Sequence, residues 1–190
     1  KETTDRVSKC VSNGGHLGST MRSLVTDDEV TEWNDRAQHN HTEVFGMTDN
    51  QFTRPNGNVS VEVAGTRAKT PASDAQALIE LVTPFDGTDV LASYGHYAWK
   101  DYAAVTRHGF GKGDAEWIAT LLDADTIRAV LREAVEHAGI ADAGTALAGQ
   151  VTVRRGTNAR GEQVTYLLNY SADEVTIASP VSGDVVVAPV

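Results

Sequence analysis

The chain has a single cysteine, Cys10, which is a candidate nucleophile for an amidotransferase-like enzyme. A nucleophilic thiol needs a sharp strand-to-helix turn with small neighbours and a lowered pKa. Val7, Cys10 and Val11 instead follow the i, i+3, i+4 spacing of one helix face. We therefore interpret Cys10 as a buried structural thiol, and rapid alkylation through a depressed pKa would be needed to support the enzymatic alternative.

A second group combines imidazoles with a carboxylate. His39, His41 and Glu43 lie within five positions, and His16 lies upstream. Such side chains could be ligands of zinc. No cysteine or second spaced pair accompanies them, and His39 lies at the end of a polar, acidic stretch at residues 26–40. We interpret them as solvated loop side chains and predict neither a metal site nor a cofactor site.

Glycines at alternate positions invite comparison with a phosphate-binding loop. Gly109, Gly111 and Gly113 have the required flexibility, but a nucleotide fingerprint needs a helix directly after the loop. Residues 114–118 are instead strand-like. The pattern predicts a hairpin turn between strands at residues 102–108 and 114–120.

Acidic residues are numerous enough to supply a glycosidase pair. Glycoside hydrolysis uses two carboxyl groups held roughly 5 to 9.5 Å apart around a pocket. The Asp and Glu residues here are scattered through loops and helix faces. Nothing singles out such a pair, so we predict no catalytic residue in this chain.

Flat rings cluster near the middle of the chain. Four aromatic residues fall within nine positions: Tyr94, Tyr97, Trp99 and Tyr102. They could form a platform on which a sugar stacks. The same cluster is typical of a packed sheet edge or a subunit contact, and we favour packing or an interface.

Helix and strand signals surround these groups. A helix around Val11 ends at Gly14, and a short strand at residues 17–21 follows. This order is the returning half of a βαβ unit, whose outgoing strand we expect before Lys1. A helical turn at residues 42–46 precedes strands expected at residues 59–63, 78–82 and 89–94. The clearest helix has apolar residues from Ile127 to Ala138, Asp123 or Asp125 as its cap, and Gly139 as its end.

About the last forty residues differ in character from the rest of the chain. Four β-rich runs occur at residues 151–155, 163–169, 174–178 and 184–188. The preceding stretch is rich in small residues. We therefore predict an α/β domain at residues 1–141, a linker at 142–149, and an antiparallel β domain at 150–190.

Composition excludes several classes of protein. The chain has 190 residues, with 16 Lys and Arg against 26 Asp and Glu, and a formal net charge of −10. Scattered basic residues do not suit nucleic-acid binding. No apolar run approaches the 20 residues or so of a membrane span, and no signal segment opens the sequence. A single cysteine implies no oxidising compartment, so we expect a cytoplasmic protein without a membrane or nucleic-acid partner.

Several short segments occur along the chain in this order: DRV with GGHL (residues 5–7 and 14–17), VTDDE (25–29), TEVFG (42–46), LASY (91–94), AVTRH (104–108), GKGDAEWI (111–118), VRRG (153–156) and YLLNYS (166–171). Together they resemble the C-terminal portion of glycoside hydrolase family 42 β-galactosidases, and the resemblance covers most of the chain.

The resemblance implies an incomplete Rossmann-like domain, similar to class I glutamine amidotransferases, followed by a small antiparallel all-β domain. It further implies a homotrimer in the full-length enzyme. Galactoside would bind in a catalytic barrel that is missing here, where two glutamates act with retention; 190 residues are too few for a barrel of about 250. The function implied is assembly and support of a β-galactosidase. The alternative is a carbohydrate-binding module that uses residues 94–102 or the C-terminal β domain.

Overall fold

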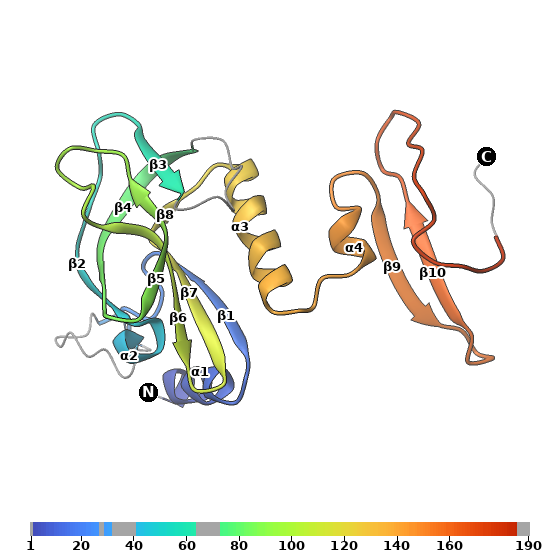
Figure 1. The fold of residues 1–190 in the computed structure, drawn as a ribbon, viewed down its shortest axis with the longest axis horizontal. Helices are drawn as coiled ribbons and strands as arrows, with labels where there is room; N and C mark the ends of the chain where they lie inside the picture. Colours follow the sequence, from blue (N-terminus) through green and yellow to red (C-terminus); the bar gives the residue numbers. More distant parts are fainter. Residues whose placement is uncertain (1, 27–28, 32–40, 64–72, 186–190) are drawn as a thin grey trace. The chain divides into compact units, whose positions relative to one another are not determined.

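The computed structural model describes residues 2–26, 29–31, 41–63 and 73–185. Their contacts divide the chain into two compact units, Lys1–Leu131 and Arg132–Val190. Figure 1 labels the helices and strands of both units. The division falls within the helix α3 (Ala124–His137).

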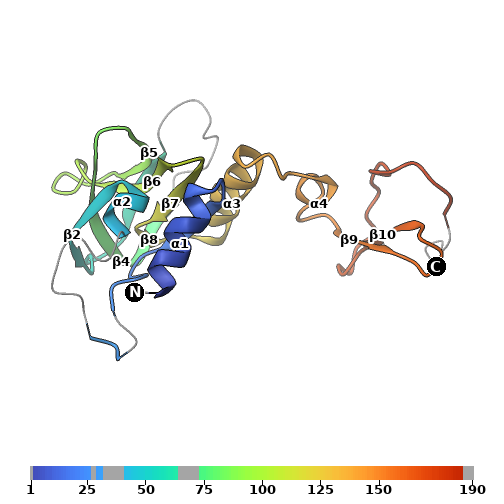
Figure 2. The ribbon, with the colours of Figure 1, turned by 90° about the horizontal axis from the view of Figure 1, so that it is seen from below.

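The first helix packs against the sheet through part of one face. α1 (Glu2–Ser12) is followed by Gly14, whose φ of +107° suits glycine. Val11 shares a buried cluster with Ala115 and Trp117 of the sheet, and Figure 2 shows α1 alongside β7. The strand β1 (His16–Thr20) follows and runs parallel to β7. The predicted helix, glycine turn and strand are confirmed.

One mixed sheet forms the rest of the first unit. Its strands pair in the order β1-β7-β6-β5-β3-β4-β2, β8 pairs with β4, and β4 also pairs with β6. The pairs are antiparallel except β1 with β7. The sheet therefore closes back on itself through the long strand β4. The strands are β2 (Met47–Thr53), β3 (Val59–Val63), β4 (Ser73–Pro84), β5 (Thr88–Tyr94), β6 (Ala103–Phe110), β7 (Gly113–Ile118) and β8 (Thr120–Leu121).

Both faces of the central strands are covered. Residues 103–107 of β6 and 115–118 of β7 are all buried. One cluster includes Val105 and Ile118, with Ile127 and Val130 of α3 packed against it. The other includes Trp117 and, from the short helix α2 (His41–Phe45), Phe45. Strands buried on both faces lose the polar alternation of a surface strand.

Local signals located the helices α2 and α3. α2 ends at Gly46, with φ +60°, as the helical turn predicted at residues 42–46 requires. Asp123 is the cap of α3, because its Oδ1 accepts the backbone N–H groups of Asp125 and Thr126 at 3.0 and 2.9 Å. No helix in the described ranges is long and apolar enough to cross a membrane.

In the residues that the structure describes, the second unit contains one antiparallel strand pair. α4 (Ala143–Ala146) lies in the stretch predicted as a linker, and β9 (Thr152–Thr157) pairs with β10 (Gln163–Leu168). These strands confirm the runs at residues 151–155 and 163–169. The prediction of a strand at residues 174–178 is wrong. Val175 and Ile177 are half-buried, but these residues do not pair with a neighbouring strand. Alternation alone cannot make a strand without a hydrogen-bonding neighbour. Most of residues 184–188 lies outside the described residues.

Candidate functional site

The aromatic cluster divides into a core residue and a surface group. Tyr94 is only 1% exposed, and its hydroxyl donates to the carbonyl oxygens of Glu80 and Ala119 at 3.0 and 3.1 Å. Burial raises the pKa of Tyr94, which keeps the hydroxyl protonated as a donor. Trp99 and Tyr102 pack partly against the same core. Packing therefore explains three of the four rings, as favoured from the sequence.

Tyr97 is different, because 88% of it is exposed. The rings of His96 and Trp99 stack with centroids 4.1 Å apart and an interplanar angle of 23°. The Tyr97 ring lies 4.5 Å from that of His96. The "aromatic stack" is the set of His96, Tyr97 and Trp99. These three residues belong to the connection from β5 to β6, whose path can be followed in Figure 1.

A buried carboxyl group lies in the middle of β4. Glu80 is 0% exposed; its Oε2 accepts the indole N–H of Trp117 at 2.9 Å, and its Oε1 accepts the backbone N–H of Arg22 at 2.7 Å. Burial raises the pKa of Glu80 to about 7, and the nearby Asp49 adds to the rise, whereas the two hydrogen bonds and the charge of Arg22 oppose it. Glu80 was not identified from the sequence. The signal that could have found it is a single charged residue inside an otherwise apolar run at residues 78–82.

The charge of Asp49 influences the pKa of Glu80, but the two carboxyl groups do not form a glycosidase site. Burial raises its pKa, and the guanidinium of Arg22, whose Nη1 is 4.0 Å from Asp49 Oδ2, opposes that rise. A hydrolytic pair must reach a sugar in a pocket. The full burial of Glu80 prevents this pair from doing so. Asp49 and Glu80 are therefore acidic groups of the protein interior and not a catalytic pair.

Arg107 and Glu116 form a second buried charged pair. They lie opposite each other on β6 and β7, and the Arg107 Nε donates to Glu116 Oε1 at 2.7 Å. A further contact joins Arg107 Nη2 to the same oxygen. Both side chains are almost completely buried. Neutralised charges of this kind stabilise one packing arrangement and offer no open ligand site.

The expectation of a buried Cys10 is wrong, because Cys10 is exposed. The residues that α1 buries are Thr4 and Val11, seven positions apart on one face, and Cys10 is rotated by about 100° from Val11. Cys10 nevertheless lies within α1 and not at a strand-to-helix turn, so its position does not match a nucleophile elbow.

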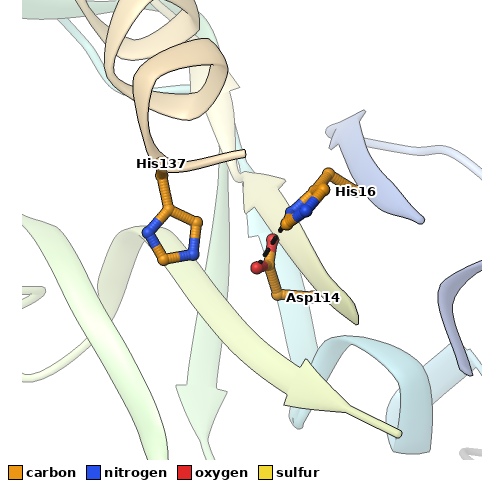
Figure 3. A group of neighbouring side chains, drawn as sticks. All are labelled: His16, Asp114 and His137. Atoms are coloured by element: carbon orange, nitrogen blue, oxygen red, sulfur yellow. Dashed lines mark ion pairs between the residues drawn. The ribbon is translucent and has the colours of Figure 1, made fainter. Parts of the chain in front are cut away.

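Among the candidate zinc ligands that the structure describes, His16 lies on β1, whereas His41 and Glu43 both lie on α2. His16 Nδ1 pairs with Asp114 Oδ2 at 3.0 Å across β1 and β7 (Figure 3). Glu43 is an exposed residue of α2, whereas His39 lies outside the described residues and the side chain of His41 is not described. The interpretation of His39, His41 and Glu43 as solvated side chains stays a prediction.

The glycine-rich segment is a hairpin turn. β6 and β7 pair from Val105 with Ile118 to Phe110 with Gly113, and Gly111 has a φ of +67°. A Cβ at Gly111 would overlap the backbone of Ser12, at the end of α1. The Lys112 N–H donates to the Ser12 carbonyl at 3.1 Å. The hairpin prediction is confirmed, and the glycine at position 111 also allows the turn to pack closely on the end of α1.

Comparisons with known proteins agree on one family. The family described as the β-galactosidase trimerisation domain matches residues 1–141. β-Galactosidase BgaA of Planococcus sp. (strain 'SOS Orange') is 26% identical over 174 residues, which cover 90% of this chain and 25% of that protein.

Solved structures share the fold. The β-galactosidase from Bacillus circulans sp. alkalophilus aligns with a TM-score of 0.76 and 19% identity, over 90% of this chain and 26% of that chain. The cold-adapted β-galactosidase from Rahnella sp. R3 aligns with a TM-score of 0.74 and 24% identity, again over 90% and 26%. The chain thus spans about a quarter of the length of these relatives.

Proposed function

This chain belongs to the family of β-galactosidase trimerisation domains, and from that premise we propose that it joins copies of a longer β-galactosidase into a homotrimer. The family match over residues 1–141 carries the proposal. The chain spans about a quarter of its relatives, which leaves room for a separate catalytic domain. The barrel of that longer protein would bind the galactoside and hydrolyse it with retention.

The chain's own charged groups support a role without catalysis. Glu80 is fully buried and accepts two N–H groups, and Arg107 is paired with Glu116 inside the sheet. Neither arrangement leaves a carboxylate facing a sugar. The burial of these two carboxylates supports the proposed non-catalytic role.

The finer architecture is also part of the proposal. We propose that residues 1–141 are an incomplete Rossmann-like domain of the class I glutamine amidotransferase type, that 142–149 are a linker, and that 150–190 are an antiparallel β domain. The parallel pairing of β1 with β7 and the end of the family match at residue 141 support it. A cytoplasmic location is proposed as well, because a single cysteine allows no internal disulfide.

Sedimentation equilibrium over a range of protein concentrations tests the assembly. We expect a reversible association that reaches three times the chain mass of 20.3 kDa. A chain that stays monomeric at all concentrations would contradict the proposal. In parallel, the chain should not cleave a nitrophenyl β-galactoside, and turnover that persists through repurification would contradict the non-catalytic role.

A further inference from the structure

We propose that the aromatic stack is the surface through which this chain contacts a second copy of itself, with Tyr97 as the anchor. The inference rests on the proposed assembly function and names the contact that would carry it. Large aromatic side chains in ordered surroundings contribute most of the binding energy at many protein interfaces. The stack is the described feature that best fits this description.

Exposure singles out Tyr97. It is the most exposed large apolar residue in the part of the chain that the structure describes, at 88%. Phe52 is partly covered, because the guanidinium of Arg22 lies 4.3 Å from its ring centroid. Phe85 is only 45% exposed. Tyr97 therefore has the largest share of apolar surface available to a partner.

The turn that carries Tyr97 is held in place before any partner binds. The N–H groups of Trp99 and Lys100 donate to the His96 carbonyl at 3.0 and 2.9 Å, and the Ala98 N–H donates to His96 Nδ1 at 3.2 Å. The Gly95 N–H donates to the Ser60 carbonyl on β3 at 2.7 Å.

Packing adds to this order. Trp99 lies against the core cluster that contains Tyr94 and Val61. Because His96 is stacked on Trp99, the ring next to Tyr97 is itself anchored to the core. An ordered aromatic side chain loses little conformational entropy on binding, which favours tight contact.

Charge argues for an apolar contact between copies. Each copy has a formal net charge of −10, so copies repel each other at long range. Attraction between two copies must therefore come from apolar surface that the contact buries, with charges of both signs at the edge of the contact. The stack is followed by one such pair of opposite charges, Lys100 and Asp101.

Three-fold symmetry determines how the contact repeats. In a ring of three copies the contact is head to tail, so Tyr97 of one copy meets a different patch of the next copy. Each of the three interfaces then contains Tyr97 once. A single substitution therefore weakens every interface of the ring.

The test compares the association of the wild-type chain with that of Tyr97→Ala and Tyr97→Phe. Tyr170→Ala is the matched control, because Tyr170 is also an exposed tyrosine, at 80%, but lies outside the stack. Sedimentation equilibrium should show about a tenfold or larger rise in the concentration at which Tyr97→Ala dissociates. Tyr97→Phe should retain most of the association and Tyr170→Ala should match wild type. Thermal unfolding, measured at a concentration at which every variant is monomeric, should be unchanged because Tyr97 is exposed.

The outcomes separate this inference from the proposed function. A wild-type chain that never associates would overturn the assembly function and this contact together. Association of Tyr97→Ala that equals wild type would overturn the contact alone. Calorimetric titration with galactose provides the other decisive result: saturable heat that Tyr97→Ala abolishes, with association unchanged, would assign the ring to sugar binding and overturn the contact.

Discussion

The indole N–H of Trp117 on β7 donates to the carboxyl Oε2 of Glu80 on β4 at 2.9 Å. Trp117 also meets the Phe45 ring edge-on, with centroids 5.0 Å apart. The Glu80 carboxyl group is thus a titratable group that is fully buried in the core of the sheet and bound there by a hydrogen bond. Its ionisation is therefore coupled to the stability of the fold.

The first prediction concerns pH. The pKa of Glu80 is raised from 4.5 to about 7 in the folded chain, so the folded state holds its proton more tightly than the unfolded state does. The stabilisation is fully present below pH 4.5 and is lost as pH rises through 7, by about 3 kcal/mol in total. Urea unfolding at several pH values should show this loss.

Glu80→Gln provides the corresponding variant. An amide cannot ionise, so the fall in the free energy of unfolding between pH 5 and 8 should become much smaller. Glu43→Gln is the control, because Glu43 is exposed on α2 and should leave the pH dependence as in wild type. An identical pH profile for Glu80→Gln and wild type would show that Glu80 is not the titrating group.

The second prediction concerns the buried pair of Arg107 and Glu116. Arg107→Met should lower the free energy of unfolding by about 3 kcal/mol, because it leaves the Glu116 charge buried without this partner. The double variant Arg107→Met with Glu116→Leu should be less destabilised than the two single losses added together. Strict additivity in urea unfolding would contradict coupling between the two residues.

A surface pair supplies the control for that experiment. Arg128 and Asp125 also form an ion pair, within α3, but both side chains are exposed. Arg128→Ala should cost only about 0.5 kcal/mol. The contrast between the two arginines tests whether burial, and not charge pairing as such, produces the large effect.

The third prediction concerns the close approach at Gly46. A Cβ there would overlap the ring of His108 and the hydroxyl of Thr88, which donates to the Gly46 carbonyl at 2.7 Å. Gly46→Ala should destabilise the chain by about 3 kcal/mol, through overlap and through its φ of +60°. Gly87→Ala, at φ +85° with open space around it, should cost only about 1 kcal/mol. Equal Tm shifts for the two variants would refute the packing explanation.

The fourth prediction contrasts two neighbours on α1. Cys10 is exposed and Val11 is 1% exposed. Cys10→Ser should change the free energy of unfolding by less than about 0.5 kcal/mol, whereas Val11→Ala should cost about 2 kcal/mol. Chemical denaturation of both variants measures this. A large loss in Cys10→Ser would restore the packing role expected from the sequence.

Local sequence signals were sufficient for several elements. The glycine after α1, the aspartate before α3 and the glycines between β6 and β7 act on their immediate neighbours, so they could be read directly. The strand β2 was not predicted. Its sequence, MTDNQFT, lacks alternation, and it forms by pairing with β4 about thirty residues later.

By itself the sequence determined the local elements and, through its ordered segments, the resemblance to one enzyme family. Only the tertiary structure decided which side chains are buried. Tyr94 and Tyr97 are three positions apart, yet one is enclosed between strands and the other is exposed. Likewise Cys10 is exposed and Glu80 is enclosed. The physical reason is that burial depends on neighbours from distant strands, which residue spacing along one segment does not specify.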